Sequence, residues 1–337
     1  MMKIVTKKYK KDSKRSLCKS KKLKKEMKNG SKPKSKITQQ NKSGGGSRFS
    51  SMVSTIFVGK FIRDDWNIRD AVNAWCEDPV AAGYVYGDIS LWNTSLVTDM
   101  SELFKNKTNF NADINTKEVT DSETGEEYTA WDVSQVTNMR AMFADARAFN
   151  QPLEQWNVGN VTNMRSMFFR AAAFNQAIGQ WNVSQVTDMS SMFLHATAFN
   201  QAIGQWNVSQ VTDMNSMFFR AAAFNQAIGQ WNVSQVTNMH GMFYGAAAFN
   251  QAIGQWNVSQ VTNMHGMFAG AAAFNQAIGQ WNVSQITDMR GMFEHAVAFN
   301  QAIGQWDVYQ VTSMRAMFWG AAAFNRDINT KEVTDRK

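Results

Sequence analysis

Residues 181–205 read WNVSQVTDMSSMFLHATAFNQAIGQ, and close copies of this segment fill most of the 337-residue chain. Tryptophans begin eight consecutive copies, 25 residues apart, at Trp131, Trp156, Trp181, Trp206, Trp231, Trp256, Trp281 and Trp306. Trp92 begins an earlier copy, which an insertion of 14 residues separates from the next. We count nine copies, of which the first is interrupted and the last is cut short. A fixed period of this length is typical of a solenoid, in which each unit packs on its neighbours.

Within one unit, the spacing of the apolar residues predicts a short helix. Side chains three and four positions apart would share one helix face; they are Val186, Met189, Met192, Phe193, Ala196 and Phe199. Ser184 or Thr187 would cap the start of this helix. Further along, Trp206 and Val208 alternate with polar Asn207, as in a strand with one buried face. The unit therefore predicts a strand, a bend, a short helix and a loop, with a parallel sheet on one face of an α/β solenoid.

The strand segment is similar to that of leucine-rich repeats. Ile203-Gly-Gln-Trp206-Asn-Val208 fits the core pattern L-x-x-L-x-L, although Val211 stands where the pattern has Asn or Cys. The complete unit, W-N-V-S-Q-V-T-D-M-x-x-M-F-x-x-A-x-A-F-N-Q, resembles the BspA-like repeat of bacterial surface proteins and mycoplasma lipoproteins, over about residues 88–330. The resemblance implies a leucine-rich-repeat-like solenoid of about nine 25-residue strand–helix repeats. For the bacterial surface members, it also implies adhesion to host or partner macromolecules.

The sequence composition divides the chain into four parts. We expect a disordered Lys-rich tail with a Gly/Ser linker at residues 1–48 and an N-terminal helical cap at 49–91. The repeat solenoid would follow at 92–330, with its insertion at about 117–130, and a short C-terminal tail at 331–337. In the cap, Ile68, Val72 and Trp75 lie on one helical stripe, and Pro79 ends that helix or begins another. This cap would cover the open edge of the first unit.

The sequence DINTKEVTD occurs twice, at Asp113–Asp121 and at Asp327–Asp335. In the first occurrence, a turn through Ser122–Gly125 and a return through Glu126–Ala130 predict a β-hairpin. In the second, the chain ends two residues later. We therefore expect a shortened relative of a longer array, whose uncovered last edge would favour self-association.

The formal net charge of +8 is the sum of two parts of opposite sign. Residues 1–48 contain 18 Lys and Arg against two acidic residues, a net charge of +16, whereas the remaining chain carries 17 basic and 25 acidic residues, a net charge of −8. A Lys-rich tail that is poor in aromatic residues is typical of disorder. Its charge would attract nucleic acid or an anionic membrane without sequence specificity. The lysines that carry this prediction are Lys7, Lys8, Lys10, Lys11, Lys21, Lys22, Lys24 and Lys25.

Residues that suggest chemistry have simpler structural interpretations. Met189 and Met192 recur at core spacing beside Phe and Ala, where methionine commonly fills gaps. We interpret the four histidines as surface side chains, because no matching set of Cys or carboxylate ligands accompanies them; they are His195, His240, His265 and His295. No segment resembles a nucleophile–base pair or a phosphate loop. We therefore expect no catalytic site, no metal, no cofactor and no enzymatic activity.

Three positions of the unit vary strongly between copies, although their surroundings do not. Counted from the tryptophan as position 1, they are positions 10, 14 and 15. Position 14 holds large aromatic residues in some copies but Ala144 and Glu294 in others, which does not fit a buried site. Because aromatic and Arg side chains are the usual interface anchors, we predict a partner-binding face made of Arg140, Arg165, Phe169, Arg170, Phe219, Arg220, Tyr244, Arg290, Arg315 and Trp319. Neutral variation at solvent-exposed sites is the alternative interpretation.

Together these features predict a non-enzymatic binding or adhesion scaffold that presents a repeated surface to a protein or glycan. The alternative is an intracellular or nuclear factor whose basic tail binds nucleic acid or an anionic surface. The sequence shows no secretory signal and no apolar run long enough for a membrane span, which favours an intracellular location. The family resemblance suggests the cell surface instead.

Overall fold

The structure, a computed structural model, describes residues 62–121 and 124–328. All of these residues belong to one compact unit, Val58–Lys337. The basic tail and the C-terminal tail expected at 331–337 lie outside the described residues. Within the described ranges, every helix is too short or too polar to cross a membrane.

Two short helices precede the repeats. Helix α3 spans Ile68–Glu77 and helix α4 spans Pro79–Tyr86. Ile68 and Val72 are fully buried, as the predicted stripe requires. Between the helices, Asp78 accepts a backbone hydrogen bond with its carboxylate and caps α4, which begins at the proline. The segment thus contains the helix that the apolar stripe predicts, and of the two roles left open for Pro79 the structure shows that it begins a second helix.

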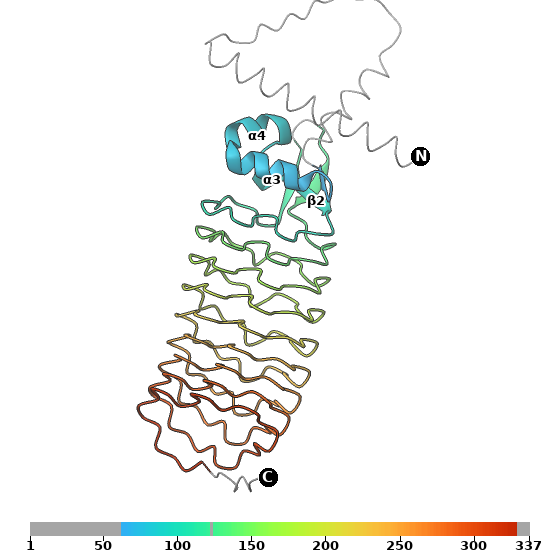
Figure 1. The fold of residues 1–337 in the computed structure, drawn as a ribbon. Coiled ribbons are helices and arrows are strands. Elements are labelled where there is room, and N and C mark those ends of the chain that lie inside the picture. The colour runs from blue at the N-terminus through green and yellow to red at the C-terminus, as the bar shows by residue number, and fades with distance from the viewer. Residues whose placement is uncertain (1–61, 122–123, 329–337) are drawn as a thin grey trace, which may run out of the picture. The chain divides into compact units, whose positions relative to one another are not determined.

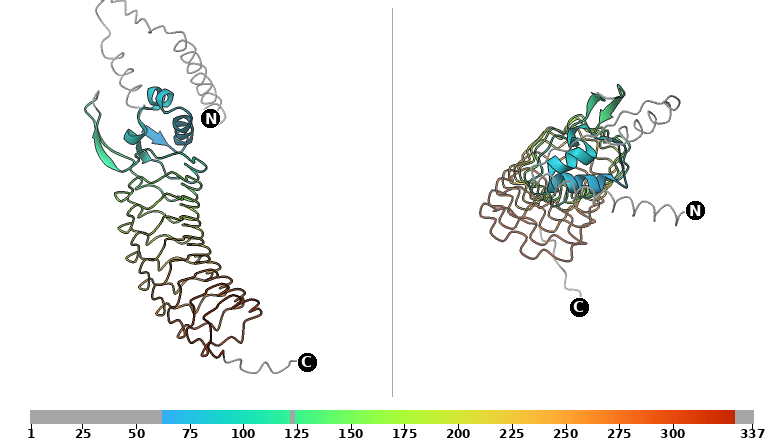
Figure 2. Two further views of the ribbon diagram at one scale, coloured as in Figure 1. Left: turned by 90° about the vertical axis from the view of Figure 1, so that its left-hand side faces the viewer. Right: turned by 90° about the horizontal axis from the view of Figure 1, so that it is seen from above.

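Two small sheets flank the start of the array. Strand β1 (Ile62–Asp64) pairs in parallel with β2 (Asn93–Leu96), and the 3-10 helix η1 (Ile89–Leu91) comes directly before β2. The insertion in the first unit forms an antiparallel hairpin of β3 (Lys117–Thr120) and β4 (Glu127–Ala130). This hairpin was predicted, and it stands out from the side of the repeats (Figure 2).

Each 25-residue unit forms one coil, and the coils follow one another in sequence order away from α3 and α4 (Figure 1). Position 8 of each coil forms a single-residue parallel bridge with position 8 of the next; the bridged residues are Asp99, Asn138, Asn163, Asp188, Asp213, Asn238, Asn263, Asp288 and Ser313. Backbone hydrogen bonds continue beyond this bridge. The amide of Met189 donates to the carbonyl of Asp213, and the amide of Ser191 donates to that of Asn215. Neighbouring coils are thus joined along their backbones.

The strand predicted at Trp206 and Val208 is wrong. Both residues are buried and Asn207 between them is exposed, so the alternation is real, but the described residues from 131 to 328 contain no strand. The backbone there forms no ladder with the next coil. Pairing between coils lies instead at position 8 and in the following segment, which the sequence predicted to be helical.

The helix predicted from the spacing of Val186 to Phe199 is also wrong, because the backbone makes consecutive tight turns there. The amide of Met192 donates to the carbonyl of Met189, three residues back, and φ is +57° at Ser191 and at His195. A helix has negative φ throughout and bonds four residues back. Amides at positions 9, 11, 13 and 15 instead donate to the next coil. Successive turns of this kind produce the same three- and four-residue spacing as a helix.

The interior of the array consists of columns of equivalent aromatic rings. Trp206 lies on Trp231 with ring centroids 6.4 Å apart and planes 2° from parallel. Phe193 and Phe199 of one coil lie 3.9 Å apart, and each also stacks on its counterpart in the next coil. Such pairs contribute about 0.5–1.5 kcal/mol each beyond simple burial. A coil therefore obtains much of its stability from its neighbours.

Amide side chains form a second connection between coils. The Oδ1 atom of Asn200 accepts hydrogen bonds from the backbone amide of Asn225, at 2.9 Å, and from Nε2 of Gln226, at 3.0 Å. The same arrangement recurs in the neighbouring coils, so these side chains act as a ladder along the array.

The last described coil is less covered than the others. Met314 is 40 % exposed, whereas Met289, its equivalent one coil earlier, is fully buried. The residues that follow 328 lie outside the described part of the chain.

Candidate functional site

Positions 10, 14 and 15 form columns along the segment of consecutive turns, and we call these residues the turn face. Position 14 of one coil meets position 14 of the next: the rings of Phe219 and Tyr244 are stacked 4.4 Å apart and 4° from parallel. Position 10 does the same, since the rings of His240 and His265 lie 4.8 Å apart. The variable residues thus lie on continuous columns. These columns run along consecutive backbone turns and not along the face of a helix.

Arginines lie against these aromatic rings in the middle of the array. The guanidinium carbon of Arg170 is 5.0 Å from the ring centre of Phe169. That of Arg220 is 5.7 Å from the ring of Phe219 and 5.9 Å from the ring of Tyr244. Contacts of this kind hold a guanidinium over an aromatic face without removing its charge. We call Phe169, Arg170, His195, Phe219, Arg220 and Tyr244 the aromatic–arginine cluster.

His195 connects the two arginines. Its ring lies 5.9 Å from that of Phe219. Burial lowers the pKa of His195 first, and the positive charges of Arg220 and Arg170 lower it further. The cluster is therefore an electropositive patch in which the histidine favours its neutral form.

Two other arginines of the turn face are ion-paired, whereas the two arginines of the cluster are not, within the residues that the structure describes. Arg140 bonds to Glu102, and Arg290 bonds to Asp288 with Nη2 and Oδ2 2.6 Å apart. Among the described residues, Arg170 and Arg220 form no ion pair. Their charges therefore remain available to an anionic group of a partner.

The remaining predicted site residues do not join the cluster. Arg165 and Arg315 are exposed at position 10. Trp319 is 63 % exposed and contacts His295 edge to face, with ring centroids 4.6 Å apart. Ala269 and Glu294 stand between Tyr244 and Trp319 in the position-14 column, so Trp319 forms a separate site.

His240 and His265, whose rings meet edge to face, are both partly buried. The pKa of His240 is lowered chiefly by burial and next by the charge of His265. No group of three or more metal-ligating side chains occurs among the described residues. Met189 and Met192 are fully buried in the core, as predicted.

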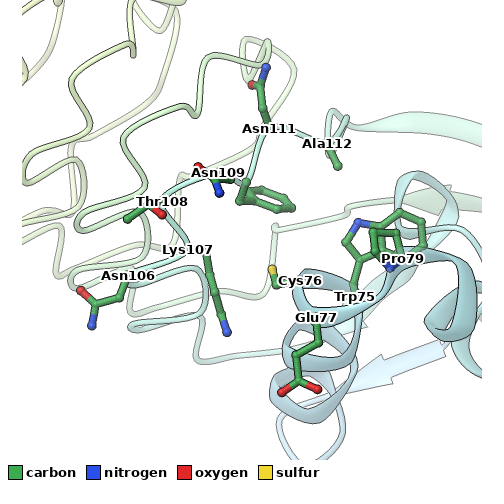
Figure 3. Close-up of a pocket in the computed structure, with 11 residues that line it drawn as sticks. Trp75, Cys76, Glu77, Pro79, Asn106, Lys107, Thr108, Asn109, Asn111 and Ala112 are labelled. Atoms are coloured by element: carbon green, nitrogen blue, oxygen red, sulfur yellow. The ribbon is translucent and has the colours of Figure 1, made fainter. Parts of the chain in front are cut away.

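A pocket that the sequence did not reveal lies between the end of α3 and the first coil (Figure 3). This cap pocket has a volume of about 490 Å³, and its lining residues are Trp75, Cys76, Glu77, Pro79, Asn106, Lys107, Thr108, Asn109, Phe110, Asn111 and Ala112. Trp75 is held by an edge contact to Trp92, with centroids 6.3 Å apart. The Nζ atom of Lys107 donates to Oδ1 of Asn73 at 2.7 Å. Burial raises the pKa of the Cys76 thiol, and the charge of Lys107 opposes this shift.

The signal for this pocket is a departure from the repeat. Positions 16 and 18 are Ala in all eight later copies, yet the first coil has Lys107 and Asn109 there. Position 21 is Gln in seven of the later copies and Arg326 in the last, but it is Ala112 in the first. The three changed residues all line the cap pocket.

Comparison with known proteins identifies one family. The family described as "Mycoplasma protein of unknown function, DUF285" matches four overlapping regions, residues 80–183, 120–231, 176–274 and 219–332. Overlapping matches of this kind are what a tandem repeat produces. No curated protein and no solved structure matches the chain. Because the matched regions together cover well over half of its length, the chain belongs to the DUF285 family of mycoplasma-type repeat proteins.

Proposed function

We propose that the protein is a non-enzymatic binding scaffold, a solenoid of the kind that the BspA-like resemblance implies, which uses its turn face to adhere to a protein or glycan. One observation carries this proposal. The residues that vary between otherwise uniform coils are the ones that form the surface columns, and in the middle of the array they form the aromatic–arginine cluster.

The chemistry of the cluster indicates the kind of partner. Phe219 and Tyr244 offer a stacked apolar surface, and Arg170 and Arg220 offer charge that no described acidic residue neutralises. Interface hot spots commonly combine aromatic and Arg side chains in this way. A segment of protein or glycan that carries both apolar faces and carboxylate or sulfate groups would satisfy them.

To test this proposal, binding of the full chain would be measured on arrays of immobilised glycans and of purified cell-surface and matrix proteins. Replacement of Phe169, Phe219 and Tyr244 by Ala should weaken binding to the best ligand by about 30-fold or more, which corresponds to the loss of a hot spot of about 2 kcal/mol. A matched control changes three exposed glutamines outside the turn face, Gln185, Gln210 and Gln235, to Ala. This control should bind like the wild type.

The basic tail requires a separate comparison, because its charge would attract any polyanion. Both variants keep the tail, so a ligand bound only by the tail would bind equally to the wild type and to both variants. Equal binding of every ligand by all three proteins would contradict the proposal. Melting curves of the variants show whether they remain folded.

A further inference from the structure

The cap pocket is a site whose chemistry the turn face does not explain. We propose that it binds one uncharged sugar residue, either a free monosaccharide or a unit of a glycan chain. Its volume of about 490 Å³ lies within the range of roughly 300–1,000 Å³ that small-molecule sites occupy. This proposal is independent of the proposed function, because no residue of the aromatic–arginine cluster is among its arguments.

The lining of the pocket fits a ring that has an apolar face and hydroxyl groups at its edge. Trp75 provides an aromatic wall. Asn106, Asn109 and Thr108 provide amides and a hydroxyl, which both donate and accept hydrogen bonds. A sugar hydroxyl also donates and accepts, so it matches such groups better than a phosphate, which needs donors alone.

The charges in the pocket are balanced. Glu77 contributes one carboxylate and Lys107 one ammonium group. A metal cation would require several oxygen ligands of negative charge, and an anion would require an excess of positive charge. An uncharged ligand requires neither.

Several polar side chains of the pocket make no hydrogen bond within the described fold. Within the described part of the chain, the side chains of Glu77, Asn106 and Asn109 form no hydrogen bond or ion pair. In later coils the residue at position 18 is Ala, so the amide of Asn109 serves no purpose that the repeat itself requires. These side chains are exposed, so they are free to form hydrogen bonds with a ligand.

Ala112 keeps the pocket open. In later coils the glutamine at this position donates to an asparagine of the preceding coil, as Gln226 does to Asn200 at 3.0 Å. At this place the first coil faces the end of α3, and no earlier coil lies beside it (Figure 3). A glutamine at 112 would therefore lack that partner and would extend into the pocket.

The rate at which the Cys76 thiol is alkylated reports whether a ligand occupies the cap pocket. The chain has two cysteines, Cys76 in the pocket lining and Cys18 in the tail. Alkylation of the full chain by N-ethylmaleimide, followed by mass spectrometry, measures both thiols in one sample. The probes are glucose, galactose, mannose, fucose, N-acetylglucosamine and N-acetylgalactosamine, each as the methyl glycoside and as short oligomers.

We expect one of these sugars to slow alkylation of Cys76 while that of Cys18 stays unchanged. At a sugar concentration of ten times Kd, about one site in eleven is free, so the rate should fall by about tenfold. Protection by the methyl glycoside indicates that a single sugar unit suffices. Protection by the oligomer alone indicates a glycan chain. If no sugar in the panel protects Cys76, the proposal is overturned.

Two variants return the first coil to the sequence of its neighbours and should abolish or weaken protection. Ala112→Gln fills the pocket, and Asn109→Ala removes an amide; each introduces the residue that other coils carry at that position. The matched control, Gln226→Ala, makes a change of similar size in the middle of the array and should leave protection intact. Full protection in Asn109→Ala and Ala112→Gln would also overturn the proposal. The triple aromatic variant of the turn face should retain protection, which separates this site from the proposed function.

Discussion

The indole nitrogen of Trp206 donates a hydrogen bond to the carbonyl oxygen of Ile178, 28 residues earlier in the chain, at 3.1 Å. Trp231 and Trp256 repeat this bond with Ile203 and Ile228 at the same distance. Each tryptophan is thus both a core side chain and a polar connection between coils. This dual requirement explains why tryptophan recurs at the same position of each unit, since it combines a large apolar surface with a single donor.

Replacement of Trp206 by Phe should show what this bond contributes. The carbonyl of Ile178 would lose one of its two donors, because the amide of Trp181 also donates to it at 3.2 Å. Loss of one such bond costs about 0.5–1.5 kcal/mol, and the smaller ring would leave unfilled space. We expect the free energy of unfolding, measured by urea titration followed by circular dichroism, to decrease by at least that amount. A variant as stable as the wild type would show that the carbonyl finds water instead.

The free energy of unfolding should depend on the partly buried asparagine acceptors of the amide ladder and much less on exposed asparagines. Asn200→Ala removes the acceptor of the Asn225 amide and one of the two acceptors of Gln226, which still donates to the backbone carbonyl of residue 200. It should therefore lower the free energy of unfolding by about 1–3 kcal/mol. Asn207, at the exposed position 2, accepts only from the amide of Ser209, at 3.2 Å. Asn207→Ala should change stability by less than about 0.5 kcal/mol. Equal losses in the two variants, measured by urea titration, would refute the ladder as a specific contribution.

Substitutions at Ser191 discriminate between consecutive turns and a helix. Because φ at Ser191 is +57°, Ser191→Gly should be neutral or stabilising, and Ser191→Val should destabilise by roughly 1–2 kcal/mol or more. In a helix the glycine would instead cost about 1 kcal/mol. Thermal melting of the two variants beside the wild type provides the comparison. A marked loss of stability in the glycine variant would support the helix.

Acidification should destabilise the protein through His240. Burial and the neighbouring His265 lower the pKa of His240 in the folded state, so the unfolded chain binds the proton more tightly. The contribution of His240 is complete above the ordinary histidine pKa of about 6.5 and decreases as the pH falls below it. His240→Asn, which introduces the residue found at position 10 in Asn215, should flatten this dependence. Melting temperatures across the range from neutral to mildly acidic pH measure it, and an unchanged pH profile in the variant would contradict the assignment.

The tryptophan period correctly indicated one structural unit per 25 residues, and the buried positions followed from the apolar pattern. The cap helix at Ile68 and the hairpin around Val119 were also predictable, because both depend on local sequence alone. The helix within each unit was not. Its spacing was right, but Gly241 and Gly245, both with positive φ, were the available signal that the backbone turns. Glycines at positions 11 and 15 of several copies would have destabilised a helix.

The candidate site was predictable in composition and only partly in arrangement. Variation between copies identified Phe169, Arg170, Phe219 and Arg220, and the structure brings them together with His195. Variation between copies could not show that Glu102 neutralises Arg140, because that contact depends on how one coil sits on the next. The cap pocket depended on the meeting of α3 with the first coil, which no single segment of sequence encodes.

The uniform join between coils has a consequence for how the gene can change. Gln230 precedes Trp231 as Gln255 precedes Trp256, and both junctions make the same indole-to-carbonyl bond. Slippage or unequal crossover in near-identical stretches of DNA would therefore add or remove a coil without leaving any join mismatched. Each such event would bring together new neighbours on the surface columns, for example Arg220 beside Gly270 in place of Gly245. The architecture thus separates what must stay constant for folding from what is free to be recombined, and a lineage could alter its surface by changing the number of its coils.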